Sequence, residues 1–179
     1  MKPFQNLGHK ISHAVSTITR GFKALQHKPS ASLKAIFIAS GAGQPMQAIS
    51  SVYADRNLGL EKDRYHDNTG HWKFTDGCQV TLITEHELKH AQKRTDIVLD
   101  GGAHRRNLVV GGIKPKALVK KRFKIGPAVF EYQKPRPPCA YIDQVEGRGI
   151  GRALRHNSGV CVRVIESGTF SIGDPVIIL

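Results

Sequence analysis

The chain is poor in acidic residues and has no long apolar run. Its 179 residues include 14 Asp+Glu against 27 Lys+Arg, and no acidic residue precedes Asp55. The longest uninterrupted apolar run, around Ala35 to Ala39, is far shorter than the ~18 residues that a membrane-spanning helix needs. We therefore expect no transmembrane segment. The formal net charge of +13 favours anionic partners such as phosphorylated cofactors, nucleic acid or an acidic membrane face.

Cysteine is also scarce. Cys78, Cys139 and Cys161 form no Cys-x-x-Cys pair and are odd in number, so the sequence indicates no disulfide framework. No apolar segment with a small-residue cleavage site follows the first basic residues. We therefore expect a reducing, cytoplasmic environment. The hydrophobic fraction of 40% suffices for the core of a single domain without metal or disulfide staples.

Residues 1–32 differ from the rest because they are basic and lack acids. Their apolar residues recur at helical spacing, at Ile11, Val15, Ile18, Phe22 and Leu25. We predict a helical or partly disordered extension with a linker over 1–32, before a domain at 33–179. Docking on that domain or partial disorder is favoured over membrane contact, since the charges are few and spread out.

From Leu33 onward the sequence is typical of short strands. Eight β-branched or aromatic runs are separated by turn residues: LKAIFIAS, AISSVYA, QVTLIT, NLVVGG, RFKIG, AVFEYQ, VCVRVIES and PVIIL. One helix is predicted from Thr84, with Glu87 completing a capping box, and a second near residues 151–157 before Gly159. This predicts a mostly β fold, a barrel of mainly antiparallel strands with a few short helices.

An H-E-x-x-H pattern lies on the helix predicted from Thr84. His86 and His90 would share one helix face for zinc, with Glu87 as general base. The helix is short, Lys89 places a charge beside the pair, and Glu87 already has a capping function. Zinc hydrolysis is therefore the weaker alternative.

Two basic segments carry little specific information. The glycines of GRGIGR at 147–152 lack the spacing of a dinucleotide fingerprint, so a flexible turn is predicted there. The stretch KPKALVKKRFK at 114–124 offers only Phe123 as a stacking ring. We expect solvated charges there and no specific nucleic-acid partner.

The segment KPRPPCAY holds Cys139 directly after two prolines. Pro137 and Pro138 fix their own φ and lack N–H groups, so the thiol is carried on a stiff arm. Arg136 would favour the thiolate, the form that attacks sulfur or binds a soft metal. Cys161, within an apolar strand, is predicted to be an inert buried residue, and Cys78 to be structural.

Two further segments contain candidate binding residues. Arg105 and Arg106 can hold a phosphate or carboxylate, and Asn107 can pair with the edge of a heterocycle. The alternative is an ordinary turn in which an arginine pairs with a surface acid. The long loop GLEKDRYHDNTGHW gathers Asp63, Arg64 and His66, and a small β domain seldom uses such a loop for connection alone.

Taken in order, these segments resemble the MOSC domain, named for the C-terminal region of molybdenum cofactor sulfurases. The resemblance rests on GLEKDRYH, CQVTLITEHEL, RRNLVVGGI, RFKIGPAVFE, PPCAY and the closing strands GVCVRVIESGTFSIGDPVIIL, from about Leu33 to Leu179. Lys62 departs from it, because the family commonly has glycine there, so the resemblance leaves the conformation of this loop open.

The resemblance implies a β-barrel that binds the molybdenum cofactor or carries activated sulfur. The family cysteine falls on Cys139 and the Arg-Asn pair on Arg106 and Asn107, while Asp63, Arg64 and His66 lie in the matching loop. Cys139 is then expected to bind molybdenum in a reductase of small N-oxygenated compounds, served by an electron-transfer partner. The alternative is a persulfide carrier that exchanges sulfur with donor or acceptor proteins.

Overall fold

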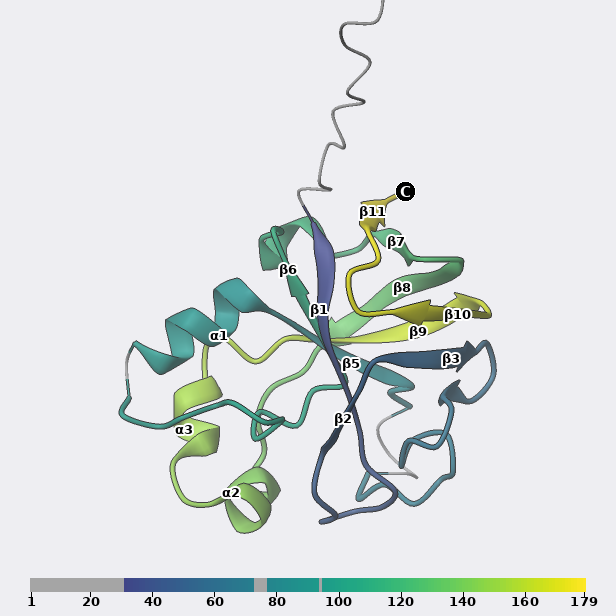
Figure 1. Cartoon of the computed structure of the whole chain (residues 1–179). Helices are drawn as coiled ribbons and strands as arrows, with labels where there is room; N and C mark the ends of the chain where they lie inside the picture. The colour runs from purple at the N-terminus through teal and green to yellow at the C-terminus, as the bar shows by residue number, and fades with distance from the viewer. Residues whose placement is uncertain (1–30, 73–76, 94) are drawn as a thin grey trace, which may run out of the picture.

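The computed structural model describes residues 31–72, 77–93 and 95–179. The helix predicted within residues 1–32 lies outside this part of the chain. The described residues contain eleven strands and three short α-helices, which confirms the mostly β fold (Figure 1). No helix in the described residues is long and apolar enough to cross a membrane.

The main sheet has eight strands in the order β11-β7-β8-β9-β5-β6-β1-β2. The strands are β1 (Ser32–Ile38), β2 (Gln47–Ile49), β5 (Val80–Thr84), β6 (Leu108–Gly111), β7 (Arg122–Ile125), β8 (Ala128–Pro135), β9 (Val160–Glu166) and β11 (Val176–Ile178). All neighbours are antiparallel except β5 and β6. An isolated bridge joins Ser32 to Pro175. No closed barrel is found among the described residues, so the barrel remains a prediction.

A smaller sheet packs against the main one. It contains β10 (Gly168–Ser171), β3 (Ser51–Asp55) and β4 (Gly59–Leu60), in that order. The run AISSVYA, which was predicted as one strand, is therefore divided at Ser50 between two sheets. Apolar side chains from both sheets form the main core, including the fully buried rings of Phe123, Phe130 and Phe170.

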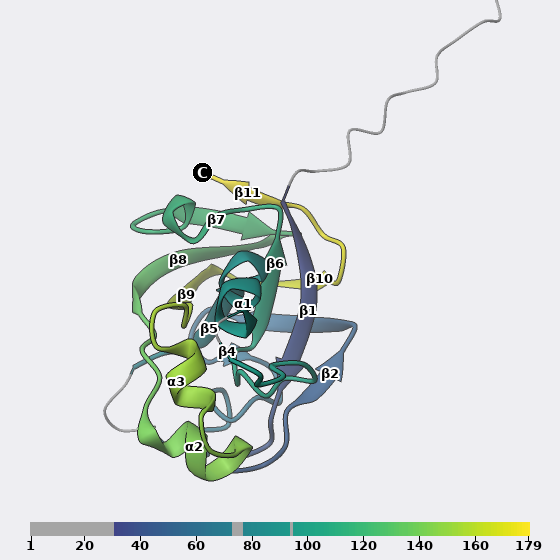
Figure 2. The same cartoon turned by 90° about the vertical axis from the view of Figure 1, so that its left-hand side faces the viewer.

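The helices lie together on one side of the strands (Figure 2). They are α1 (Glu85–Gln92), α2 (Ala140–Glu146) and α3 (Ile150–Leu154), and a 3₁₀ turn covers Pro115–Ala117. A second apolar cluster joins the strands to α2 and α3 through Phe37, Ile83, Val109, Ile142 and Leu154. Burial of this helical face explains why short helices persist that would be marginal alone.

The capping box predicted for α1 is confirmed. Thr84 Oγ1 accepts a hydrogen bond from the Glu87 N–H (3.1 Å), and the Glu87 carboxylate accepts one from the Thr84 N–H (3.0 Å). The flexible turn predicted at 147–152 is partly wrong, because α3 begins at Ile150 and buries Ile150, Ala153 and Leu154. Helix α3 therefore begins one residue before the predicted second helix and ends at Leu154, short of the predicted end. Helix α2 was not predicted.

Cys78 and Cys161 are bonded to each other, which corrects the expectation of no disulfide. Cys161 of β9 pairs with Thr81 of β5, and Cys78 lies three residues before Thr81. This places the two Cα atoms 5.6 Å apart, within the usual range for a disulfide. The prediction failed because the strand pairing that brings them together cannot be read from cysteine spacing.

Candidate functional site

Cys139 is the free cysteine of the described residues and lies at the end of a stiff arm. Strand β8 ends at Pro135, and the Arg136 N–H still donates to Gly159 O (2.9 Å). Pro137 and Pro138 then lead away from the sheet, and Cys139 precedes α2 as its N-cap. The backbone before the thiol is thus held by the last sheet contact and by two rings of fixed φ.

The thiol lies where two hollows meet. An inner hollow of about 50 Å³ and an outer one of about 580 Å³ share the lining residues Trp72, Arg136, Pro137, Pro138 and Cys139. We call these two hollows the Cys139 cleft. The volume of the outer hollow is in the range of small-molecule sites, so the cleft can admit a ligand to the partly exposed Cys139.

Aromatic rings form one wall of the inner hollow. His71 stacks on Tyr141 with ring centroids 3.8 Å apart, and Trp72 meets His71 edge-on at 4.8 Å. His71 belongs to the long loop that was expected to carry function, whereas Trp72 and Tyr141 were not predicted as site residues. Tyr141 is two residues beyond Cys139, but the pairing with His71 depends on a loop about seventy residues earlier, which sequence spacing does not reveal.

Arg106 provides a buried positive charge in the cleft. Its guanidinium donates to the carbonyl oxygens of Ser158 (2.7 Å), His104 (3.2 Å) and Arg136 (3.2 Å). Burial lowers the pKa of Arg106 to about 10, whereas the charges of Tyr65 and Cys139 act in the opposite direction. Arg106 therefore stays charged at neutral pH and lies within electrostatic reach of the Cys139 thiol.

Arg105 connects the neighbouring loop to α2. Its φ of 53° is in the left-handed region, which is uncommon for a residue with a side chain. The guanidinium donates to Gln44 O (3.0 Å) and to the Glu146 carboxylate (2.6 Å) at the end of α2. Arg105 also lines the inner hollow, so it holds the helix that follows Cys139 while facing the cleft.

Asp63 and Asn107 form a fully buried polar pair. Asn107 Nδ2 donates to Asp63 Oδ1 (3.0 Å) and to Phe37 O (3.0 Å). Asn107 Oδ1 accepts from the Thr81 N–H (3.1 Å) and hydroxyl (2.8 Å). The amide thus uses its hydrogen-bonding groups inside the protein, and the expectation that Asn107 pairs with a heterocycle edge has no support in this geometry.

The second carboxylate oxygen of Asp63 fixes the loop that carries Arg64. Asp63 Oδ2 accepts from the Tyr65 N–H (3.1 Å), and Oδ1 accepts from Arg64 Nη1 (3.0 Å). Arg64 also donates to Arg105 O (3.4 Å), which links both predicted segments. The structure therefore brings Asp63, Arg64, Arg105, Arg106 and Asn107 together beside the cleft.

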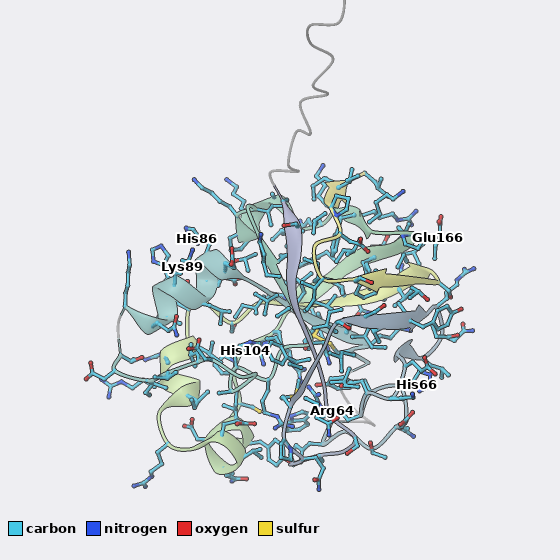
Figure 3. All side chains as sticks on the ribbon, viewed as in Figure 1. Arg64, His66, His86, Lys89, His104 and Glu166 are labelled. Carbon is cyan, nitrogen blue, oxygen red and sulfur yellow. A yellow bond between two sulfur atoms is a disulfide. The ribbon has the colours of Figure 1, made fainter. Side chains whose placement is uncertain are left out.

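His66 is not part of this group. Its ring contacts Asp67 (2.6 Å), and it lines another hollow, of about 410 Å³, which Cys78 and Arg64 also line but Arg105, Arg106 and Asn107 do not. In the side-chain view, His66 and Arg64 are seen on different parts of the loop (Figure 3). Residues 61–68 form consecutive turns, so neighbouring positions in the motif need not face one site.

Lys62 adopts a φ of 62°, the left-handed conformation that glycine takes without steric cost. This explains how lysine occupies a position where glycine is common. The loop keeps the glycine-type backbone and tolerates the strain, because the hydrogen bonds of Asp63 hold the next residues in place.

The geometry does not favour a zinc site on α1. His86 and His90 are neighbours, with ring centroids 4.5 Å apart, but the Glu87 carboxylate is buried and bonded to Thr84 and to the Gly159 N–H (3.0 Å). No cluster of three metal-binding side chains is found within the described residues. Figure 3 shows His86 on α1, apart from Arg64 of the cleft.

Comparison with known proteins identifies the family. A family model of the MOSC domain matches residues 69–177. The YUAD protein from Bacillus subtilis has a similar fold, with a TM-score of 0.69 at 14% identity over 83% of this chain and 94% of that one. YiiM from Geobacillus stearothermophilus has a TM-score of 0.64 at 13% identity, over 83% of this chain and 75% of that one. YiiM from Escherichia coli has a TM-score of 0.60 at 14% identity, over 83% of this chain and 69% of that one. No curated protein matches the chain. With the family model covering more than half of its length, the chain belongs to the MOSC domain family.

Proposed function

We propose that this protein binds the molybdenum cofactor in the Cys139 cleft, with the Cys139 thiolate as a metal ligand. One observation carries the proposal: the buried Arg106 cation lies within electrostatic reach of Cys139 and, in the described residues, hydrogen-bonds to carbonyl oxygens and to no carboxylate. A buried cation without a bound acid is costly, and an anionic ligand would offset that cost.

The residues of the cleft suit this cofactor. The molybdenum cofactor is a pterin dithiolene with a phosphate, so it presents a soft metal, a flat ring and an anion. A thiolate is a preferred ligand for a soft metal, and guanidinium groups match phosphate oxygens. Cys139, Arg106 and Arg136 line the inner hollow, and the rings of His71 and Tyr141 provide a flat wall.

The proposed reaction is the two-electron reduction of small N-oxygenated compounds. A hydroxylamine R–NHOH takes up two electrons and two protons and gives R–NH₂ and water, with the electrons supplied by a protein partner. The bound cofactor would supply the two-electron centre. Arg106 and Arg136 would hold the anionic part of the ligand, while Trp72 and the two prolines would line its entrance.

A persulfide carrier is the second candidate. Cys139 is partly exposed and ends a rigid arm, as a group that passes sulfur between proteins requires. In that case the arginines would dock an acidic donor or acceptor protein. Both candidates keep a cytoplasmic location, where Cys139 stays reduced, and neither needs a specific nucleic acid.

Molybdenum and pterin analysis separates the two candidates. The full chain is purified from a host that makes the cofactor, and metal content, pterin fluorescence and intact mass are measured. We expect about one molybdenum per chain, strongly reduced in Cys139→Ser and partly reduced in Arg106→Gln. Arg122→Gln, which removes an exposed arginine on β7, is the matched control and should keep the metal. A sulfur adduct on Cys139 without molybdenum would replace the first candidate with the second.

A further inference from the structure

The Cys78–Cys161 pair lies next to the Cys139 cleft. Cys161 belongs to β9 and is fully buried, whereas Cys78 precedes β5 and is 5% exposed. Cys78 lines the 410 Å³ hollow, together with Arg64, His66 and Gln79. Cys78 lines this hollow and Cys161 does not, so a solute in the hollow approaches the disulfide from the Cys78 side.

The two sulfur atoms also differ in electrostatic surroundings. Arg136 Nη1 donates to Cys161 Sγ over 4.0 Å, so a guanidinium lies beside the buried sulfur. In thiol–disulfide exchange the attacked sulfur must be accessible, and the departing sulfur leaves as a thiolate that a cation stabilises. The access to Cys78 and the positive charge beside Cys161 thus favour the same reaction, in which the thiol attacks Cys78 and Cys161 leaves as the thiolate.

We propose that the hollow beside Cys78 is a thiol–disulfide exchange site for a small anionic thiol, and that the redox state of Cys78–Cys161 controls Cys139 through Arg136. A thiolate RS⁻ attacks Cys78 Sγ, forming Cys78–S–S–R and releasing the Cys161 thiolate beside Arg136. A second RS⁻ attacks the R sulfur, giving RS–SR and the Cys78 thiolate. Two thiolates are oxidised to RS–SR and the protein disulfide takes up the two electrons. The Cys78 thiolate then gains a proton from water, while the Cys161 thiolate stays charged beside Arg136.

The lining of the hollow suits such a thiol. Arg64 and His66 offer hydrogen-bond donors for a carboxylate, and Asn57, Asn68 and Gln79 offer polar groups for a peptide-like molecule. In reducing compartments, protein disulfides are usually transient and catalytic or redox-sensing rather than structural staples. The basic chain and the expected cytoplasmic location therefore favour an abundant acidic thiol as the reductant.

Arg136 connects this pair to the cleft. Its Nη2 donates to Tyr65 Oη (3.0 Å), and its carbonyl oxygen accepts from Arg106 (3.2 Å). A thiolate at Cys161 attracts the Arg136 guanidinium more strongly than a disulfide sulfur does, so it competes with Tyr65. Arg136 lines both hollows of the cleft together with Cys139. Reduction of the Cys78–Cys161 disulfide therefore changes the electrostatic surroundings of Cys139. This inference does not depend on whether the cleft holds molybdenum.

Glutathione is a suitable probe of the exchange site. The full chain carrying Cys139→Ser is incubated with reduced glutathione, quenched with acid, and analysed by intact mass and peptide mapping. We expect a mixed disulfide between glutathione and Cys78. In the double variant Cys139→Ser/Cys161→Ser, incubated with oxidised glutathione, this mixed disulfide should accumulate. The matched variant Cys78→Ser should form little adduct on Cys161. An adduct mainly on Cys161, or a disulfide that resists glutathione in the folded protein, would overturn the proposal.

A second measurement tests the link to Cys139. Iodoacetamide alkylation of Cys139 is followed by peptide mapping in the oxidised and the glutathione-reduced wild-type chain, with circular dichroism confirming that both are folded. The rates should differ on the order of fivefold, the rate equivalent of about 1 kcal/mol. Arg136→Gln should remove the difference, whereas Arg122→Gln should keep it. Equal rates in both redox states, or a difference that survives Arg136→Gln, would contradict control through Arg136.

Discussion

At the scale of single residues, Asp63 organises the loop beside the cleft. Its carboxylate is fully buried and accepts hydrogen bonds from the Ala39 N–H, Arg64 Nη1 and Asn107 Nδ2, each at 3.0 Å, and from the Tyr65 N–H. The carboxylate thus positions two cleft residues, Arg64 and Tyr65, without facing the ligand space itself. Its role is to position other residues.

Replacing Asp63 with alanine should destabilise the protein by about 3 kcal/mol, because Arg64 and Asn107 then lose a buried acceptor. Urea unfolding followed by circular dichroism measures this change. Asp67→Ala is the control, since the Asp67 side chain is 46% exposed and contacts the exposed ring edge of its neighbour His66. An Asp63 variant as stable as the Asp67 variant would show that the buried network contributes little.

His104 gives the stability a predictable pH dependence. Burial, with the positive charge of Arg106 as a smaller cause, lowers the pKa of His104 from 6.5 to about 3. The neutral ring accepts the Arg106 N–H at Nδ1 (3.0 Å). Below pH 6.5 the unfolded chain binds a proton that the folded chain does not bind until about pH 3, so stability is lost as pH falls through this window.

We expect this group to lower the free energy of unfolding by up to about 2 kcal/mol between pH 7 and pH 5. Urea titrations at several pH values measure the slope. His104→Gln should flatten it, because glutamine can accept the same hydrogen bond and does not titrate there. His156→Gln changes an exposed histidine and should leave the slope as it is. Parallel pH profiles for wild type and His104→Gln would refute the assignment.

At the scale of elements, the ion pair between Arg105 and Glu146 holds α2 against the loop that contains Arg106. The side chains are 7% and 20% exposed, so the pair is largely shielded from water. Glu146→Ala would remove the acidic partner of the buried Arg105 guanidinium, and should lower the free energy of unfolding by about 1–3 kcal/mol. Amide hydrogen exchange in α2 should become faster as the helix end loosens.

Mass spectrometry of exchanged peptides covering Ala140–Glu146 gives this measurement. Glu166→Ala removes an exposed carboxylate on β9 and serves as the comparison. It should leave α2 exchange unchanged. If the Glu146 variant exchanges no faster than the Glu166 variant, the ion pair does not hold the helix.

Elements with local signals were predictable from the sequence. The capping box of Thr84 and Glu87 involves residues three apart, and it set the start of α1 correctly. Helix α2 has no such signal, because its N-cap Cys139 makes no side-chain capping bond and its stability comes from tertiary contacts such as Ile142 and Glu146. The division of one run into β2 and β3 likewise depends on which sheet each half meets.

At the scale of the whole molecule, the ordered motifs predicted the family and the mostly β fold. They also predicted five residues that meet beside the cleft, since Asp63 and Arg64 join Arg105, Arg106 and Asn107. The motifs could not assign Asn107 and Asp63 to a buried network, place His66 beside Cys78, or reveal the stacking of His71 on Tyr141. Those features depend on contacts between distant segments.

The proposed function requires the Cys139 thiolate to be a ligand of molybdenum. X-ray absorption at the molybdenum edge, on protein purified from a cofactor-competent host, tests it most directly because the spectrum counts sulfur ligands. We predict one sulfur ligand fewer in any metal retained by Cys139→Ser than in the wild-type chain, with Arg122→Gln unchanged. Molybdenum bound with the same sulfur coordination in wild type and Cys139→Ser would show that Cys139 is not a ligand.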